Sequence, residues 1–372
     1  MFFSVIFFIY ILLNFYVYVR IRSLFRRKSH RLVLTILFAA FTVLFPVSEM
    51  VSHAGGASSG AIVLLLGYLS LPFLLYLFLL VLLSDILRGI NRILKIVAVE
   101  KLQSRIARIV TLCMLLIVPT VIVIAGMAWF SDIRINRYSV QVPRRASPLK
   151  HLTVALASDF HLNRMTDETF LTRFSARVNR LQPDLLLIPG DVLEGDRQDG
   201  QLSRFQEAFR QIRTTYGVFG SLGNHESFGR RGNLGFFSRS NIVLLQDSTP
   251  VVGSAFTLVG RRDTRDPQRK PIEQLMRSVA DSLPVIVLDH RPVDLEAISE
   301  THSDIVVSGH THHGQLFPLN LITTRIYEVS WGYEKKGNTH VFVTSGIQVW
   351  GPPVRTAGDS EIMLIDVDFV DR

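Results

Sequence analysis

Cysteine is almost absent from this sequence. The only thiol among the 372 residues is Cys113, which lies inside an apolar run. A single cysteine excludes a disulfide within the chain and a cysteine-based zinc site. Any metal site in this chain must therefore be built from nitrogen and oxygen ligands.

Charged residues are scarce in the first 130 positions, although the whole chain carries a formal net charge of +9. The apolar fraction is 48% and the mean hydropathy is +0.30, with the apolar excess concentrated in this N-terminal part. A helix across the hydrocarbon core of a bilayer needs about 20 apolar residues. Four runs are long enough, over residues 2–19, 32–48, 61–84 and 109–130. The sequence therefore predicts a membrane domain of four transmembrane helices within residues 1–131.

Lysine and arginine are missing from the second connection, residues 49–60, but they are frequent in the connections on either side. The first connection carries Arg20, Arg22, Arg26, Arg27, Lys28 and Arg31, and the third carries Arg88, Arg92, Lys95, Lys101, Arg105 and Arg108. Basic connections stay in the cytoplasm. Four spans then place both termini outside, so we expect a multi-pass protein of the bacterial inner membrane with a periplasmic or extracellular C-terminal domain. Basic residues after the last run, including Arg144 and Arg145, argue against this orientation unless they contact anionic headgroups.

The pattern of apolar and polar residues changes at about residue 150. Short apolar runs then alternate with amphipathic stretches such as residues 167–181 and 271–283. This alternation predicts an α/β domain with buried strands over residues 151–372. Residues 132–150 contain scattered arginines and two prolines, Pro143 and Pro148, and are expected to form a linker.

Polar clusters follow five of the apolar runs in this domain: "SDFHLN", "GDVLEGD", "GNHE", "DHRP" and "SGHTHHG". They supply Asp159, His161, Asp191, Asn224, His225, His290, His310 and His312. Taken singly, each residue is explained as well by a turn or a cap. Loops at the carboxyl ends of strands, however, converge on one crevice in open α/β sheets. Five such loops with carboxylate, amide or imidazole groups therefore predict one shared site.

Neutral imidazoles and carboxylates bind divalent transition metals. Seven ligands are too many for one ion and suit two ions that share a carboxylate. Two metals about 3.5–4 Å apart can hold a phosphoryl group and generate hydroxide at neutral pH. We expect His310 and His312 to reach different metals, with Gly309 allowing the backbone to turn tightly between the strand and the loop.

The five motifs resemble those of the calcineurin-like metallophosphoesterases, and in particular a membrane-anchored bacterial phosphodiesterase branch. The matching segments are Asp159-Phe160-His161, Gly190-Asp191, Gly223-Asn224-His225-Glu226, His290 and Gly309-His310-Thr311-His312. The resemblance covers about residues 150–372 and extends to "GIQVWGPPVR" near the end of the chain. It implies a four-layer αββα sandwich, in which two mixed sheets pack face to face with helices outside.

The resemblance also implies a role for each residue. One metal would be held by Asp159, His161 and His312, the other by Asn224, His290 and His310, and Asp191 would bridge both. The ions would be Mn, Fe or Zn, and a hydroxide held between them would attack phosphorus in line.

Two further residues would serve catalysis. His225 would stabilise the phosphoryl oxygens and protonate the leaving oxygen, and Glu226 would orient its imidazole. Glu194 and Asp196 stand at positions that support the ligands in relatives, and no catalytic role is assigned to them. His313 replaces a frequent glycine and is expected to be exposed rather than to contact substrate.

Four spans are more than a tether requires, which favours a membrane lipid or a lipid-linked phosphoester as substrate. Residues 227–240 and 315–325 combine basic or apolar side chains near the predicted site, so they suit a membrane interface. Burial of Phe236 and Phe237 in the core explains the first segment equally well.

Two alternatives remain open. One is a cytoplasm-facing pyrophosphatase that cleaves UDP-diacylglucosamine in lipid A synthesis. The other is a non-enzymatic membrane scaffold or sensor, against which His225 speaks because a structural metal site does not need it. The basic segment 261–270, "RRDTRDPQRK", is expected to be a solvated loop, and no nucleic-acid partner is predicted.

Overall fold

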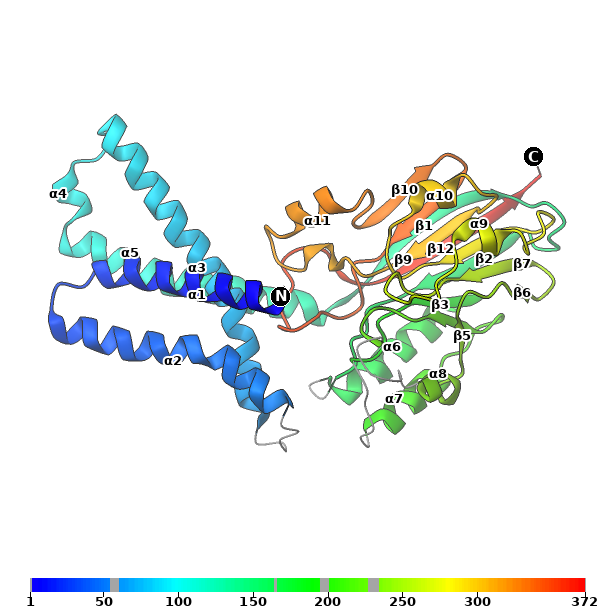
Figure 1. The fold of residues 1–372 in the computed structure, drawn as a ribbon, viewed down its shortest axis with the longest axis horizontal. Helices are drawn as coiled ribbons and strands as arrows, with labels where there is room; N and C mark the ends of the chain where they lie inside the picture. Colours follow the sequence, from blue (N-terminus) through cyan, green and yellow to red (C-terminus); the bar gives the residue numbers. More distant parts are fainter. Residues whose placement is uncertain (1, 54–59, 164–165, 195–200, 227–233, 372) are drawn as a thin grey trace. The chain divides into compact units, whose positions relative to one another are not determined.

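The computed structural model describes the chain except residues 1, 54–59, 164–165, 195–200, 227–233 and 372 (Figure 1). The chain divides into two compact units. One comprises residues 1–128 with 351–354, and the other comprises residues 129–350 with 355–372.

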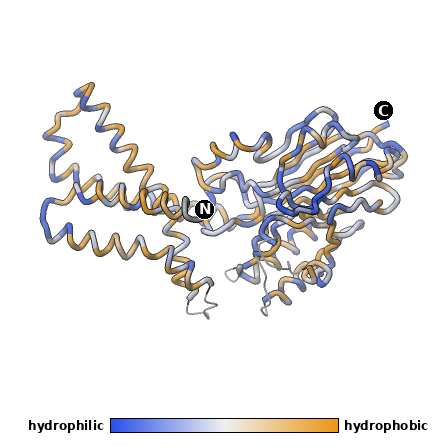
Figure 2. The backbone as a smooth tube through the Cα atoms, viewed as in Figure 1, coloured by the Kyte–Doolittle hydropathy of each residue, from blue (hydrophilic) through white to orange (hydrophobic). Residues whose placement is uncertain are grey.

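The first unit is helical. Its helices are α1 (Phe2–Ser23), α2 (Lys28–His53), α3 (Ala61–Leu94), the single turn α4 (Val99–Leu102) and α5 (Arg105–Ser131). Apolar residues dominate the four long helices (Figure 2), and large side chains such as Ile36, Ile62 and Leu116 are exposed. Three segments are long and apolar enough to cross a membrane: Lys28–Ser52, Ala61–Leu94 and Arg105–Ser131. An exposed apolar surface of this kind is matched by lipid rather than by water.

The described chain thus supports three spans rather than the four predicted. A helix, α1, does form over the first predicted span, residues 2–19, and Arg20 and Arg22 lie in its last turn. Tyr16 and Arg20 of α1 also contact Asp85 of α3, at 2.6 Å and 2.5 Å.

The second unit contains two mixed six-stranded sheets, as the resemblance implies. The first has the order β1 (Ile133–Pro143), β12 (Ser360–Val370), β2 (His151–Leu156), β3 (Leu185–Pro189), β4 (Val218–Ser221) and β5 (Ile242–Leu245). The second has the order β10 (Gly332–Lys336), β11 (Thr339–Val343), β9 (Ile305–Ser308), β8 (Val285–Leu288), β7 (Phe256–Gly260) and β6 (Val251–Val252). Strands β2 to β5 are parallel, and so are β7, β8, β9 and β11.

Successive apolar side chains of the strands point to opposite faces of the sheets, so that three apolar layers form. Leu185 and Leu187 face the other sheet, where they pack in one core with Ile286 and Leu288. Their neighbour Leu186 packs on the opposite face, against the helices α6 (Glu168–Leu181), α7 (Gln201–Arg210) and α8 (Leu234–Arg239). The outer face of the second sheet is covered by α9 (Ile272–Met276) and α10 (Leu295–Ser299). The period-2 pattern of strands therefore produces a helix–sheet–sheet–helix sandwich.

Residues 132–150 do not form only a linker, because most of them belong to strand β1. This strand pairs in parallel with β12 along eleven residues, from Ile133↔Ser360 to Pro143↔Val370. Val140 and Val142 of β1 join the core between the sheets. The arginines that suggested a linker are paired within the domain: Arg144 contacts Asp371 at 2.6 Å and Arg145 contacts Asp304 at 2.5 Å.

Candidate metal centre

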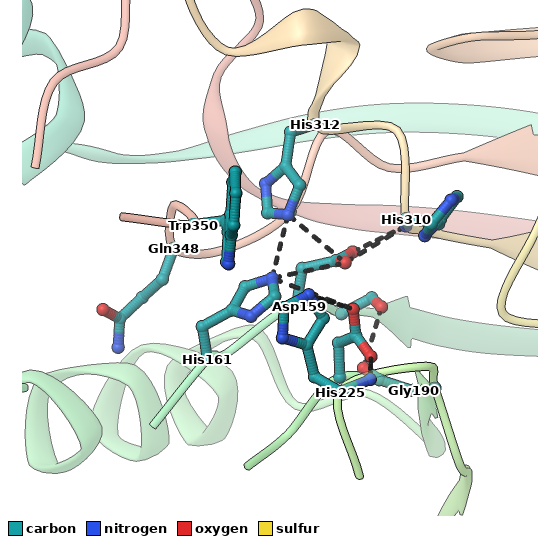
Figure 3. A network of polar contacts seen from close by, with 12 residues as sticks. Asp159, His161, Gly190, His225, His310, His312, Gln348 and Trp350 are labelled. Atoms are coloured by element: carbon teal, nitrogen blue, oxygen red, sulfur yellow. Dashed lines mark hydrogen bonds and ion pairs between the residues drawn. The ribbon is translucent and has the colours of Figure 1, made fainter. Parts of the chain in front are cut away.

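The predicted ligands lie in loops at the carboxyl ends of five strands. In the first sheet, Asp159 and His161 follow β2, Asp191 follows β3, and Asn224 and His225 follow β4. In the second sheet, His290 follows β8, and His310 and His312 follow β9. Because parallel strands end at the same edge, the loops of both sheets meet there (Figure 3).

One group of donor atoms is formed by Asp159, His161 and His312. The Nε2 atoms of His161 and His312 lie 2.9 Å apart, and Oδ1 of Asp159 lies 3.8 Å and 3.6 Å from them. Two atoms that share an ion at about 2.0–2.2 Å are at most about 4.4 Å apart. The three side chains are buried and aim at one point, as Figure 3 shows.

A second group is formed by Asp191, His290 and His310. Oδ2 of Asp191 and Oδ1 of Asn224 each lie 3.2 Å from Nε2 of His290. The same Oδ2 atom lies 3.9 Å from Nε2 of His161, so Asp191 stands between the two groups. The structure thus brings all seven predicted ligands together.

Imidazole hydrogen bonds show that this arrangement fits a cation. His290 donates from Nδ1 to the carbonyl of Pro189, and His161 donates from Nδ1 to Glu194. In their neutral forms both rings therefore turn an Nε2 lone pair inward, toward oxygen or nitrogen acceptors. Metal-binding histidines usually donate their other ring N–H in this way. In the described part of the chain, Nδ1 of buried His312 has no hydrogen-bond partner.

The electrostatics point the same way. Burial works against the charged form of Asp191, but His290, His161 and His225 hold its pKa well below the usual value. Burial also disfavours a charged His290, yet Asp191 and Asp159 outweigh it and raise the pKa of His290 to about 10. Burial, then the charges of His290 and Arg291, lower the pKa of His310 to about 2. Without a bound cation the two carboxylates thus place a proton on His290, which a metal ion would displace.

Glu194, rather than Glu226, orients His225. Its carboxylate accepts from Nδ1 of His225 at 2.9 Å and from Nδ1 of His161 at 2.6 Å. Burial opposes ionisation of Glu194, but these two imidazoles lower its pKa to about 2. The sequence signal for this role is its place three residues after Asp191 in "GDVLEGD". Asp196 lies outside the described residues.

Glu226 instead ties two loops together, which corrects its predicted role. Its carboxylate accepts the backbone N–H groups of Val192 at 2.5 Å, Leu193 at 2.9 Å and Gly223 at 2.7 Å. Burial, and then the charge of Asp191, raise its pKa to about 7. Glu226 therefore fixes the loop that carries Asp191 relative to the loop that carries Asn224.

The backbone of the site is strained. Five of the seven predicted ligands adopt the left-handed conformation, with φ between 42° and 71°: Asp159, His161, Asp191, His310 and His312. Each such non-glycine residue costs about 1–2 kcal/mol, and strain of this kind gathers at functional sites. Gly309 is required for close approach rather than for a turn, since a Cβ there would lie 2.2 Å from Oδ2 of Asp159.

The basic segment 261–270 supports the loop of His290 and is not simply a solvated loop. Arg261, 2% exposed, and Arg269 both contact Oδ2 of Asp289 at 2.7 Å. On the other side of His290, Arg291 contacts Asp263 at 3.1 Å. Ion pairs thus hold both neighbours of this ligand in place.

Two residues of "GIQVWGPPVR" also support the centre. Arg355 is fully buried and donates to the carbonyl of Gln348 at 2.6 Å and to that of His312 at 3.4 Å. The exposed ring of Trp350 lies 6.2 Å from that of His225 (Figure 3). His313, expected to be exposed, is half-buried: its Nδ1 lies 3.1 Å from Oγ of Ser330, and its ring packs on Trp331.

Replacing Glu194 with alanine tests the support of the candidate ligands. We expect Glu194→Ala to weaken the binding of a divalent ion by about 10–100-fold, because His161 loses the partner that aims Nε2 at the centre. Calorimetric titration of the full chain with Mn²⁺ or Zn²⁺ measures this. Glu207→Ala, at an exposed position on α7, should leave affinity unchanged. Equal affinity in the two variants would mean that Glu194 does not support a ligand.

Comparisons with known sequences point to the same family that the five motifs resemble. The calcineurin-like phosphoesterase family matches residues 152–314. A metallophosphoesterase of Helicobacter pylori (strain J99) is 30% identical over 220 residues, which are 57% of this chain and 59% of that protein. A transmembrane protein with metallophosphoesterase domain from Danio rerio is 30% identical over 242 residues, 60% of this chain and 55% of that protein.

A third relative is the UDP-2,3-diacylglucosamine pyrophosphatase LpxG of Chlamydia trachomatis, 23% identical over 50% of this chain and 70% of that protein. The chain covers less than two thirds of the length of the Helicobacter and Danio relatives. Residues 152–314 therefore form a calcineurin-like phosphoesterase domain, and the relatives that share it are named metallophosphoesterases.

Proposed function

We propose that the protein is a membrane-anchored phosphoesterase that uses two divalent metal ions, Mn, Fe or Zn, to hydrolyse a phosphoester of a membrane lipid or a lipid-linked molecule. The observation that carries this proposal is the convergence of seven nitrogen and oxygen ligands from five separate loops. Asp159, His161 and His312 form one group of donor atoms and Asp191, His290 and His310 form another, while a third group, His161, Asp191 and His225, lies between them, with the atoms of each group within 4.8 Å of one another. One ion would be held by Asp159, His161 and His312, and the other by Asn224, His290 and His310, with Asp191 shared.

When bound, such a pair of ions supplies Lewis acidity and a nucleophile at neutral pH. The residues of the chain provide the rest. His225 is held through Nδ1 by Glu194, and its Nε2 lies 3.9 Å from Oδ2 of Asp191, at the edge of the centre. It is only partly buried, so a substrate can reach it. His225 is therefore placed to stabilise the phosphoryl oxygens and to donate a proton to the leaving oxygen.

Several observations support a substrate in the membrane. Three helices are able to span a bilayer, and one relative is named a transmembrane protein with metallophosphoesterase domain. Another relative is named UDP-2,3-diacylglucosamine pyrophosphatase, and the substrate in that name carries acyl chains. Residues 227–233 of the predicted docking segment, with Arg230 and Arg231, lie outside the described residues, while Phe236 and Phe237 are core residues of α8.

The catalytic domain is proposed to face the periplasm or the exterior of a bacterial inner membrane. This orientation does not depend on α1. With the basic connections before α2 and before α5 in the cytoplasm, α2, α3 and α5 cross outward, inward and outward. The basic residues after α5 no longer argue against it, since Arg134, Arg144 and Arg145 contact Asp359, Asp371 and Asp304 within the domain.

The alternatives are weighed by the same observations. A cytoplasm-facing UDP-diacylglucosamine pyrophosphatase would need the opposite orientation, because its nucleotide-linked substrate is cytoplasmic. A metal-dependent scaffold without activity would not need His225, whose ring is nevertheless fixed by Glu194.

Removing a shared or an unshared ligand tests the activity. We expect Asp191→Ala and His310→Ala to lower metal-dependent hydrolysis of the soluble diester bis(p-nitrophenyl) phosphate by at least about 10³-fold, because catalysis requires both ions. The matched control Asp281→Ala changes an exposed carboxylate of the same domain and should keep full activity. Activity of either ligand variant close to that of the unchanged chain would contradict the proposed centre.

A topology measurement separates the first two functions. With alkaline phosphatase or green fluorescent protein fused to the C-terminus, the proposed orientation predicts an active phosphatase and a dark fluorescent protein. The reverse pattern would reject an outward-facing enzyme and favour the cytoplasmic pyrophosphatase.

A further inference from the structure

The segment between the metal loop and β10 presents an unusual apolar surface. Within residues 316–326, which we call the apolar rim, five large side chains are between 37% and 66% exposed: Phe317, Leu319, Leu321, Ile322 and Ile326. Helix α11 (Asn320–Ile326) forms most of this segment and has no buried residue. Monomeric soluble domains seldom expose such a continuous run of large apolar groups, and a run of this kind marks a contact surface.

The composition of the rim suits a bilayer interface. From residue 315 to 327 the sequence has no acidic residue, and its one charge is Arg325. Exposed apolar side chains insert at the level of the headgroups, where Asn320, Thr323 and Thr324 can remain hydrated. A cation at this level is attracted to anionic headgroups. A protein partner recognised through ion pairs would not match this surface.

Both ends of the rim are attached to the metal centre. At its start, Gln315 follows the loop of His310 and His312, and its backbone N–H donates to the carbonyl of His312 at 2.9 Å. At its end, the ring of Tyr327 packs on that of His310, with centroids 5.9 Å apart. The rim is therefore part of the border of the site.

The chain also keeps this domain near a membrane. The last candidate span ends at Ser131, and β1 begins at Ile133. With one residue between them, the domain is tethered close to any bilayer that this span crosses, which raises the effective concentration of lipid around the domain.

We propose that the apolar rim contacts the bilayer and holds the metal centre at the membrane surface, so that a lipid phosphoester enters the site without leaving the membrane. This inference rests on the proposed function for its substrate, but the contact with the bilayer can be tested without any activity.

Fluorescence quenching tests the contact directly in the full chain. Ile322→Cys is made in a Cys113→Ser background, labelled with a fluorophore, and reconstituted into nanodiscs with and without doxyl-labelled lipid. The matched control is Val251→Cys, equally exposed on β6 at the edge of the second sheet. We expect the lipid-borne quencher to lower the emission at position 322 by about half or more and to leave position 251 nearly unchanged. Three results would overturn the proposal. Position 322 could be quenched by aqueous iodide instead, or it could be protected from both quenchers by the helices of the chain or by a second copy. Equal quenching at both positions would also contradict the contact.

Activity gives a second, independent measurement. The combined variant Leu321→Ser, Ile322→Ser, Ile326→Ser should hydrolyse a bilayer-borne phospholipid at least about tenfold more slowly, while its activity toward the soluble diester stays unchanged. The control Val243→Thr, Val251→Thr should retain both activities. Equal loss on both substrates would mean that the rim only positions the site, which contradicts the proposal. If the unchanged chain hydrolyses neither substrate, the proposed function fails, and the quenching result still decides whether the rim contacts lipid.

Discussion

Two buried carboxylates in one pocket are the constraint on which the rest of the catalytic domain depends. Asp159 and Asp191 are at most 1% exposed, and an uncompensated buried charge costs several kcal/mol. The surrounding imidazoles turn nitrogen lone pairs toward the carboxylates, so they compensate the charge only by taking up a proton or by sharing a cation. The proposed dinuclear metal centre would meet this need, since two divalent ions would satisfy the carboxylates and the lone pairs at once.

The remainder of the fold holds this costly arrangement in place. Both sheets contribute loops at their carboxyl edge, and the core between them fixes the distance between these loops. Glu226 ties together two loops of the first sheet, while Arg261 and Arg269 hold the loop of His290 through Asp289. Five of the candidate ligands have left-handed backbone angles, which non-glycine residues rarely adopt. Tertiary contacts, and not the conformational preference of these residues, therefore determine the backbone of the site.

The sequence was sufficient to predict which side chains come together at the candidate site, but not which residues support them. Each ligand is marked by a local pattern, a polar cluster after an apolar run, and strand ends in an α/β sheet converge. Glu194 and Glu226 have similar local surroundings, and only the folded loops show which carboxylate reaches His225. Strand β1 was missed because its partner is β12, more than 200 residues away in sequence. In addition, the arginines of β1 interrupt the apolar alternation that its valines would otherwise show. Counting apolar residues predicted four spans, of which the described chain supports three.

The loop that supplies His310 and His312 leads directly into the apolar rim, and in the proposed account this connection would link the chemistry to the membrane. The central claim is nevertheless the number of ions that the site holds. Metal analysis of the purified full chain by mass spectrometry, after dialysis against metal-free buffer, measures this most directly. The account predicts about two equivalents of Mn, Fe or Zn per chain. One equivalent or none, in a folded chain offered each of these metals in excess before dialysis, would contradict it.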